Sequence, residues 1–230
     1  MDKLSINKKE WDNIEKVLLE MIPDYDDING RITFWQDKKW RKAIARMSRG
    51  KDVAVEVGSG PGTLAVLLES KKVICVDPIP EMNEVCEKRI KLNSNSKLDN
   101  YKFITAPAES IPLPDNCADI VYCAFSFRDF YDKKKGLLEM HRILKKDGEL
   151  IILDIAKHDG IYGKLIHFYM SNIAPVMAFK QYKAVKCLAE TYKAFAPPKY
   201  YEKIMSKMGF NEFKLKFFNF KTIFLLKAKK

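Results

Sequence analysis

The chain has 230 residues, 47% of them hydrophobic, so it is long enough and apolar enough to bury a core. This composition excludes an intrinsically disordered protein. Lysine and arginine number 41 against 30 acidic residues, a formal net charge of +11. The surface is therefore expected to attract anions such as nucleic acid, an acidic membrane face or phosphorylated substrates.

The five cysteines favour neither a disulfide framework nor a zinc ribbon, because they are odd in number and contain no Cys-x-x-Cys pair. We therefore expect a reducing, cytoplasmic environment. No stretch approaches the roughly 20 consecutive apolar residues that a membrane span needs, and residues 1–10 are too polar for a signal peptide. The sequence predicts a protein that is soluble or that contacts the inner face of a membrane peripherally.

The first 49 residues are predicted to form a helical segment that caps the functional site. Trp11, Ile14 and Leu18 follow each other at spacings of three and four, which is typical of one face of an amphipathic helix, and Pro23 ends this pattern. A second helical stretch follows and closes at Gly50.

The main fold is predicted to begin at residue 50, where short apolar runs alternate with helical patterns. The expected strands are Val53–Val57, Val73–Asp77, Tyr101–Thr105, Asp119–Phe125 and Leu150–Ile155. Helical patterns between them cover Leu64–Ser70, Glu81–Lys91 and Lys133–Lys145. This order predicts an α/β fold, a Rossmann-like parallel sheet with helices on both faces.

The last third of the chain departs from this alternation. Residues 157–198 are helical in propensity, rich in aromatic residues and broken by Pro175, and we interpret them as a lid over the carboxyl edge of the sheet. A final helix over Tyr200–Met208 precedes two short strands, Phe213–Phe218 and Thr222–Lys227, expected as an antiparallel edge pair. The core of residues 50–230 is then a seven-stranded, mainly parallel sheet with one antiparallel edge strand.

A glycine-rich turn follows the first predicted strand, with the sequence Glu56-Val57-Gly58-Ser59-Gly60-Pro61-Gly62-Thr63. Its glycines let the backbone turn tightly and approach a ligand where a Cβ would collide. The turn is not a P-loop, because Gly-Lys-Ser/Thr does not follow it, and its Gly-x-Gly-x-Gly spacing also departs from G-x-G-x-x-G. Glu56 at the strand end favours a ligand that carries positive charge over a pyrophosphate.

Asp77 ends the second predicted strand, where acidic residues of nucleotide-binding folds accept hydrogen bonds from a ribose diol. Alone, Asp77 could instead cap a helix that begins near Pro78. Acidic residues at two strand ends beside a glycine turn favour a bound nucleoside over a tight turn without a ligand.

These residues resemble the class I S-adenosylmethionine-dependent methyltransferases, whose glycine motif has the same acidic-x-G-x-G-x-G form. Residues 106–115, 119–125 and 138–148 follow in the order of that family. From Tyr25 onward the chain resembles, more narrowly, the ubiquinone/menaquinone biosynthesis C-methyltransferase family. The narrower resemblance rests on Tyr25-Asp26, Asn29, Trp40-Arg41, Ala124-Phe125-Ser126-Phe127-Arg128-Asp129, Leu188-Ala189-Glu190 and Met208-Gly209-Phe210.

The resemblance implies S-adenosylmethionine as cofactor and S-adenosylhomocysteine as product. Glu56 would lie near the methionine amino group, and Asp77 would hold the ribose hydroxyls. Pro107 replaces the Asn or Asp of the family, so the backbone N–H of Ala108 would bind the adenine, with Glu109 at its border. Met82, unless it is simply a core residue, would contact the adenine. The expected cofactor residues are Glu56, Gly58, Ser59, Gly60, Gly62, Thr63, Asp77, Pro78, Met82, Pro107, Ala108, Glu109 and Ala124.

Methyl transfer from a sulfonium needs an aligned acceptor and excluded water, so we expect neither a metal nor a covalent nucleophile. For an aromatic acceptor, Arg128 would stabilise a phenolate, unless it forms a surface ion pair with Asp129 or Asp132. Asp129, where the family has Asn, or His167 would act as general base, although His167 could simply be packed on an apolar face. Tyr25 would close on the acceptor or pack in the core.

The expected acceptor is a lipophilic aromatic molecule or a polyprenyl quinol. RNA, protein or another small molecule are alternative substrates, and a cofactor-binding module without catalysis is a further alternative. The basic residues occur in scattered short runs, which favours an ordinary solvated surface. Two more specific interpretations of the positive charge remain. One is contact with an acidic membrane leaflet, and the other, less favoured, is binding of nucleic acid. The sequence does not determine the oligomeric state.

Overall fold

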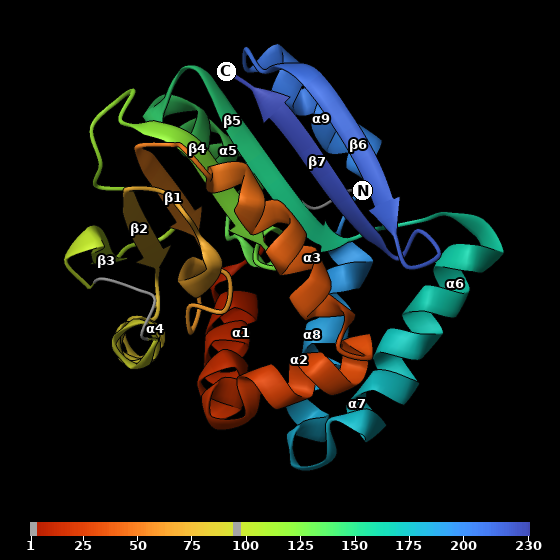
Figure 1. Cartoon of the computed structure of the whole chain (residues 1–230). Helices are drawn as coiled ribbons and strands as arrows, with labels where there is room; N and C mark the ends of the chain where they lie inside the picture. Colours follow the sequence, from red (N-terminus) through yellow and green to blue (C-terminus); the bar gives the residue numbers. More distant parts are fainter. Residues whose placement is uncertain (1–3, 94–97) are drawn as a thin grey trace.

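The structure is a computed structural model, and residues 4–93 and 98–230 are described. Residues 1–3 of the polar amino-terminal stretch and the side chain of Leu188 lie outside the described part of the chain. One seven-stranded sheet forms the centre of the molecule, with the strand order β3-β2-β1-β4-β5-β7-β6 (Figure 1). The strands are β1 Val53–Val57, β2 Lys72–Asp77, β3 Tyr101–Thr105, β4 Ala118–Ala124, β5 Leu144–Ile155, β6 Asn211–Phe218 and β7 Ile223–Lys229.

The predicted mainly parallel sheet is confirmed. β1 pairs in parallel with β2 and β4, β2 with β3, and β4 with β5. The last two strands form the expected antiparallel pair at the edge. Within this pair β7 is the antiparallel strand, because it also runs against β5, and β6 is the outermost strand.

Helices cover both faces of the sheet, and side chains alternate between two cores. Along β4, Val121 and Cys123 face one core, and Ile120 and Tyr122 face the other. The α-helices are α1 Lys8–Met21, α2 Tyr25–Thr33, α3 Gln36–Ala45, α4 Pro80–Leu92, α5 Lys133–Ile143, α6 Gly160–Phe168, α7 Ala174–Met177, α8 Tyr182–Ala194 and α9 Pro198–Lys207. Short 3-10 helices cover Ile22–Asp24, Arg46–Ser48, Ala65–Leu67, Leu98–Asn100, Phe127–Asp129 and Phe179–Gln181.

The expected helix over Leu64–Ser70 is wrong, because only the single 3-10 turn Ala65–Leu67 forms there. The chain leaves this turn at Leu68 in an extended conformation. The next residues are then held against the 3-10 helix Arg46–Ser48, since the Glu69 N–H donates to Ser48 Oγ at 2.7 Å and Ser70 Oγ donates to the Ser48 carbonyl at 3.2 Å. These contacts stop the helix after one turn. β5 also begins at Leu144 rather than Leu150, directly after α5.

The lid and the amino-terminal helices lie together beyond the carboxyl ends of the parallel strands (Figure 1). Met21 of α1 and Ile28 of α2 share a small apolar core with Ala174, Ala178 and Val185 of the lid; its other buried member is Ala184. The expected break at Pro175 is wrong, because the chain stays helical through it: a π-helical turn over Tyr169–Ile173 leads directly into α7, with Pro175 in its first turn.

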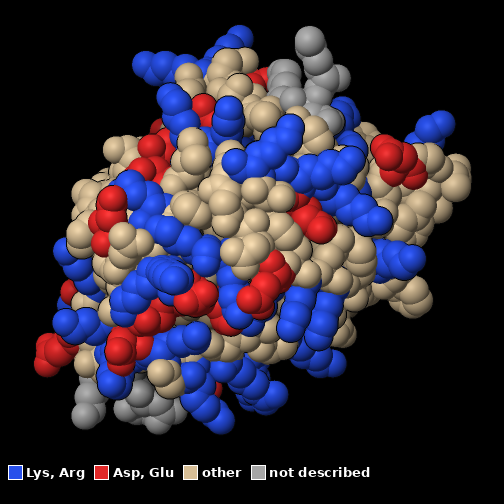
Figure 2. Space-filling model, turned by 90° about the horizontal axis from the view of Figure 1, so that it is seen from above, with Lys and Arg blue, Asp and Glu red and all other residues tan. Residues whose placement is uncertain are grey.

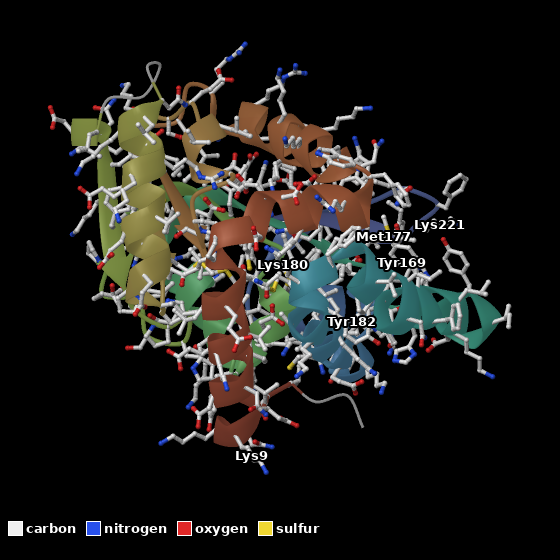
Figure 3. All side chains as sticks on the ribbon, turned by 90° about the horizontal axis from the view of Figure 1, so that it is seen from below. Lys9, Tyr169, Met177, Lys180, Tyr182 and Lys221 are labelled. Atoms are coloured by element: carbon white, nitrogen blue, oxygen red, sulfur yellow. The ribbon has the colours of Figure 1, made fainter. Side chains whose placement is uncertain are left out.

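A half-buried tyrosine joins the lid to the amino-terminal segment. Tyr169 Oη donates to the carbonyl of Ile32 at 2.6 Å and lies 3.6 Å from Met177 Sδ, so α2, the π-helical turn and α7 are held together. Tyr169 and Met177 project close to each other when the lid is viewed from below (Figure 3).

Positive charge is dispersed on the face of the molecule that Figure 2 shows. On the face seen from above, lysine and arginine are interspersed with acidic residues (Figure 2), and this distribution fits the interpretation as a solvated surface. Among the described residues, none of the helices is long and apolar enough to cross a membrane.

Candidate active site

The glycine turn between β1 and the 3-10 turn Ala65–Leu67 needs its glycines. Gly58, Gly60 and Gly62 have φ values of +70°, +52° and +78°, which side chains other than glycine rarely adopt. A Cβ at Gly58 would clash with Ser126 Oγ, and one at Gly62 would lie 2.5 Å from Cys86 Sγ. The turn therefore packs closely against the segment after β4 and against α4.

Asp77 at the end of β2 holds the glycine turn in place. One carboxylate oxygen accepts the Gly60 N–H at 2.7 Å, and the other accepts the Ile79 N–H at 3.0 Å. Burial raises the pKa of Asp77 to about 6, against the effect of these two hydrogen bonds. Because a carboxylate has roughly four acceptor positions, two hydrogen bonds leave capacity for a ribose diol.

Glu56 is a buried carboxyl group, 1% exposed, and its Oε2 has no hydrogen-bond partner. Burial raises its pKa to about 8, while the guanidinium of Arg41 acts in the opposite direction. A buried carboxyl in this state favours a ligand with an ammonium group, because such a ligand would restore its charge and supply the missing donor.

A cavity of about 330 Å³ lies against the glycine turn at the carboxyl ends of β1, β2 and β4. Its walls bring together most of the residues expected to bind the cofactor, namely Gly58, Gly60, Asp77, Pro78, Met82, Pro107, Ala108, Glu109 and Ala124. Met82 is also buried, so its two suggested roles are compatible. Four residues that were expected to bind the cofactor do not belong to the described lining of this cavity: Glu56, Ser59, Gly62 and Thr63.

Thr63 connects the glycine turn to the helix that carries Tyr25. Its Oγ1 donates to Asp26 Oδ1 at 3.0 Å, and Arg89 of α4 pairs with the other oxygen of Asp26 at 2.7 Å. This bridge fixes α2 over the turn. In the structure Thr63 is therefore a positioning residue rather than a cavity residue.

A second, larger cavity of about 520 Å³ lies between the amino-terminal helices and the lid. Its walls are mainly apolar and include Ile32, Trp40, Ile155, Leu165, Ile166, Met170 and Val185. The two cavities share Leu18, Tyr25, Phe125 and Asp129. One chamber therefore lies beside the glycine turn, and a second, mainly apolar chamber adjoins the first. The two chambers meet at Tyr25 and Asp129.

Arg128 lies in the wall of the second cavity and is held by two acidic residues. Its Nη1 is 2.7 Å from Asp154 Oδ1, and its Nη2 is 3.5 Å from Asp129 Oδ2. Nη1 also donates to the carbonyl of Phe125. Burial acts against the charged guanidinium, but the charges of Asp129 and Asp154 outweigh it and raise the pKa of Arg128.

The alternative of a surface ion pair for Arg128 is wrong, since its guanidinium is buried and Asp132 instead caps α5 by accepting the Lys135 N–H at 3.0 Å. Asp129 is also buried, one of its oxygens has no hydrogen-bond partner, and burial raises its pKa although Arg128 opposes this. Burial likewise raises the pKa of Tyr25 against the charges of Arg41 and Arg128.

The structure does not bring His167 to this site. The described walls of the two cavities do not include it, its Nε2 lies 3.2 Å from Ser171 Oγ, and its ring stacks on Tyr192 with centroids 6.4 Å apart. Its environment is that of a packed histidine of the lid. Asp129 is therefore the better placed of the two candidate bases.

Sequence reasoning missed the roles of Arg41 and Asp154. Arg41 is 3% exposed, lines the second cavity and lies over the ring of Phe125 at 4.9 Å, and its Nε has no hydrogen-bond partner. Asp154 is fully buried and positions Arg128. An acidic residue inside the apolar run Leu150–Ile155 was the available signal for Asp154. For Arg41 the signal was a cation on the buried face of a helix next to Trp40.

Comparison with known proteins agrees with this geometry. A sequence profile of the ubiE/COQ5 methyltransferase family matches residues 5–228. The chain belongs to this family. It is therefore an S-adenosylmethionine-dependent methyltransferase. The glycine turn with Asp77 and Glu56 suits that cofactor: Glu56 is a buried acid whose Oε2 has no partner and could pair with the ammonium group, and Asp77 is an acidic residue at a strand end that could bind the ribose.

The relatives are distant but span nearly the whole chain. The ubiquinone/menaquinone biosynthesis C-methyltransferase UbiE of Geotalea uraniireducens (strain Rf4) is 31% identical over 216 residues, covering 90% of this chain and 91% of the relative. A demethylmenaquinone methyltransferase of Thermus thermophilus is 27% identical over 202 residues, with 84% and 90% coverage.

Solved structures confirm the class I methyltransferase fold. A SAM-dependent methyltransferase from Thermotoga maritima superposes with a TM-score of 0.67 at 21% identity, covering 96% of this chain and 99% of that one. A second, from Aquifex aeolicus, gives a TM-score of 0.60 at 19% identity, with 82% and 88% coverage.

Proposed function

We propose that this methyltransferase transfers a methyl group to a ring carbon of a lipophilic aromatic acceptor of the quinol type, bound in the larger cavity. The observation that carries the proposal is the junction of the two cavities at Tyr25, Phe125 and Asp129. Two guanidinium groups, Arg41 and Arg128, face an otherwise mainly apolar chamber there. The names of the relatives, which describe quinone methylation, support the same acceptor class.

The donor cavity supplies binding and orientation. When bound, S-adenosylmethionine provides an electrophilic methyl group on a sulfonium. Glu56 would pair with the ammonium group and Asp77 with the ribose hydroxyls, while Ile79, Met82 and Ala108 would give apolar contacts to the base. Burial of these groups keeps water away from the junction, which strengthens each polar contact.

The acceptor side supplies charge. A ring carbon becomes nucleophilic when a neighbouring phenol loses its proton, and Arg128 would stabilise that phenolate, with Asp154 fixing the guanidinium. Asp129, buried and with one oxygen free of partners, would accept the phenol proton. After the methyl group is attached, the same carbon loses its hydrogen as a proton, which restores the aromatic ring.

The decisive experiment follows the label from methyl-labelled S-adenosylmethionine into separate lipid, RNA and protein fractions. We expect label in the lipid fraction, little with Arg128→Lys, and normal amounts with the control Arg142→Lys, since Arg142 pairs with Asp115 and Glu139 away from both cavities. Label in RNA or protein instead would overturn the acceptor. Cofactor binding without transfer to any fraction would favour a non-catalytic module.

Such an acceptor resides in a bilayer. We therefore propose a cytoplasmic enzyme that works at the inner face of a membrane, and we disfavour nucleic acid as a partner because the positive charge is dispersed on the face shown in Figure 2.

A further inference from the structure

Three of the side chains that line the larger cavity are large, apolar and exposed to solvent. Phe34, Leu165 and Phe220 line the cavity and are nevertheless 60%, 58% and 88% exposed. They come from three separate places, the turn between α2 and α3, helix α6, and the turn between β6 and β7. We call these three residues the apolar rim.

Two of the rim residues are displayed by unfavourable backbone conformations. Asn219, Phe220 and Lys221 have consecutive φ values of 46°, 52° and 65°, which cost about 1–2 kcal/mol per residue for side chains other than glycine. Phe34 and its neighbour Trp35 also have positive φ values. Such strain is usually retained for a function, and here it projects aromatic rings outward.

The turn that carries Phe220 is fixed by hydrogen bonds. Thr222 Oγ1 donates to the carbonyl of Asn219 at 2.7 Å, and a ring nitrogen of His158 lies 2.6 Å from the carbonyl of Lys221. The turn that exposes the ring of Phe220 is therefore fixed by these two contacts.

Helix α6 continues the rim with an apolar stripe on its outer face. Ile161, Leu165 and Phe168 are spaced by four and three residues, so they lie on one face of the helix, and Ile161 is 74% exposed. Ile166 on the opposite face is buried. An ordinary surface helix shows the reverse arrangement, with polar residues outward.

Lysines accompany these apolar residues. Lys164 and Lys221 are both exposed. Lys164 directly precedes Leu165 in the chain, and Lys221 directly follows Phe220. In the underside view Lys221 and Lys180 lie on opposite sides of Tyr169 and Met177 (Figure 3). Apolar side chains at the centre with cations beside them suit the boundary between acyl chains and anionic headgroups.

We propose that the apolar rim and the outer stripe of α6 insert into the surface of an anionic bilayer, so that the larger cavity opens into the lipid. The proposal rests on the proposed function, because a lipophilic acceptor would then enter the cavity without crossing water. A lipid surface explains the pairing of exposed apolar groups with lysines better than a protein partner, whose interface would be depleted of lysine at its core.

The test is sedimentation with vesicles of phosphatidylcholine alone or mixed with phosphatidylglycerol. We expect the protein to bind the anionic vesicles more tightly and salt to weaken this binding. Ile161→Ser/Phe168→Ser, which leaves the cavity walls intact, should lower the partition coefficient by about tenfold or more. The matched control is Leu92→Ser/Leu138→Ser, which removes exposed apolar groups from α4 and α5.

Two further measurements distinguish a loss of membrane binding from a loss of folding or of catalysis. Lys164→Glu/Lys221→Glu should weaken binding to the anionic vesicles only, and thermal melting should show that all variants are folded. Failure of the wild-type protein to bind vesicles, or equal binding by the α6 variant and its control, would overturn the proposal. Vesicle binding without label in the lipid fraction would support docking while overturning the acceptor.

Discussion

Glu56→Gln should raise the stability of the protein while lowering its affinity for the cofactor. The folded-state pKa of Glu56 is about 8, compared with an ordinary value of 4.5. A raised pKa means that this group adds no penalty below pH 4.5 and destabilises the fold increasingly as the pH rises toward 8. At pH 7 the cost is up to about 3–4 kcal/mol, at roughly 1.4 kcal/mol per pH unit above 4.5. Glutamine avoids this cost, because it is neutral at every pH.

Cofactor binding should change in the opposite direction. Below pH 8 the free protein holds Glu56 protonated, so pairing with an ammonium group first requires loss of that proton. The affinity of the wild-type protein should therefore rise by up to about tenfold per pH unit as the pH approaches 8. At pH 8, Glu56→Gln should lose about 10–100-fold, the equivalent of one charged hydrogen bond of about 1.5–3 kcal/mol.

Urea unfolding and calorimetric titration with S-adenosylhomocysteine at pH 6, 7 and 8 would measure both effects, with the exposed Glu84→Gln as the control. Any pH dependence that remains in Glu56→Gln below about pH 7 is expected from Asp77, whose pKa is about 6, and from Asp129, whose pKa burial also raises. Equal affinity of wild type and Glu56→Gln at pH 8, or a less stable variant at pH 7, would refute the assignment of Glu56 as the buried partner of the ammonium group.

Three shorter predictions concern the rest of the site. Gly62→Ala should destabilise the fold by about 2 kcal/mol or more, because its Cβ would meet Cys86 Sγ at 2.5 Å at a φ of +78°; a melting temperature equal to that of wild type would contradict this. Asp77→Asn replaces one acceptor oxygen that holds the turn, so cofactor affinity should fall by about tenfold or more in the same titration. Asp154→Asn should lower kcat with little change in cofactor affinity, because it acts through the guanidinium of Arg128; an unchanged kcat on a quinol acceptor would exclude that role.

The sequence allowed the sheet and the donor cavity to be predicted because their signals are local. The strands are short apolar runs between turn residues, and the glycine turn combines its φ requirement, its acidic neighbour Glu56 and the second acid Asp77 within one β-turn-β stretch. Each of these residues is positioned by elements adjacent to it in the chain. The packing of the turn against Ser126 and Cys86, and the bridge from Thr63 to Asp26, depend on tertiary contacts and were not predicted.

The acceptor cavity could not be predicted in the same way. Arg128 was found from its motif, but its burial depends on Asp154, which lies on a different strand. Arg41 reaches the cavity only because α3 packs its buried face, with Trp40, over the sheet. His167 failed for the converse reason: its position in the lid does not fix which face of α6 meets the cavity, and the ring stacks on Tyr192 instead.

The helices around the larger cavity are held more loosely to the sheet than the donor site is. The glycine turn is fixed by backbone donors to Asp77 and by close packing on α4. The lid contacts α1 and α2 through a core of mostly small residues and through hydrogen bonds from Tyr169 to the Ile32 carbonyl and from Gln181 to the Glu20 carbonyl. Tyr25 and Leu18 belong to those amino-terminal helices and line both cavities. A movement of the lid would therefore shift the walls of the acceptor chamber while the cofactor residues stay in place, and the bridge from Thr63 through Asp26 to Arg89 limits how far α2 can follow it.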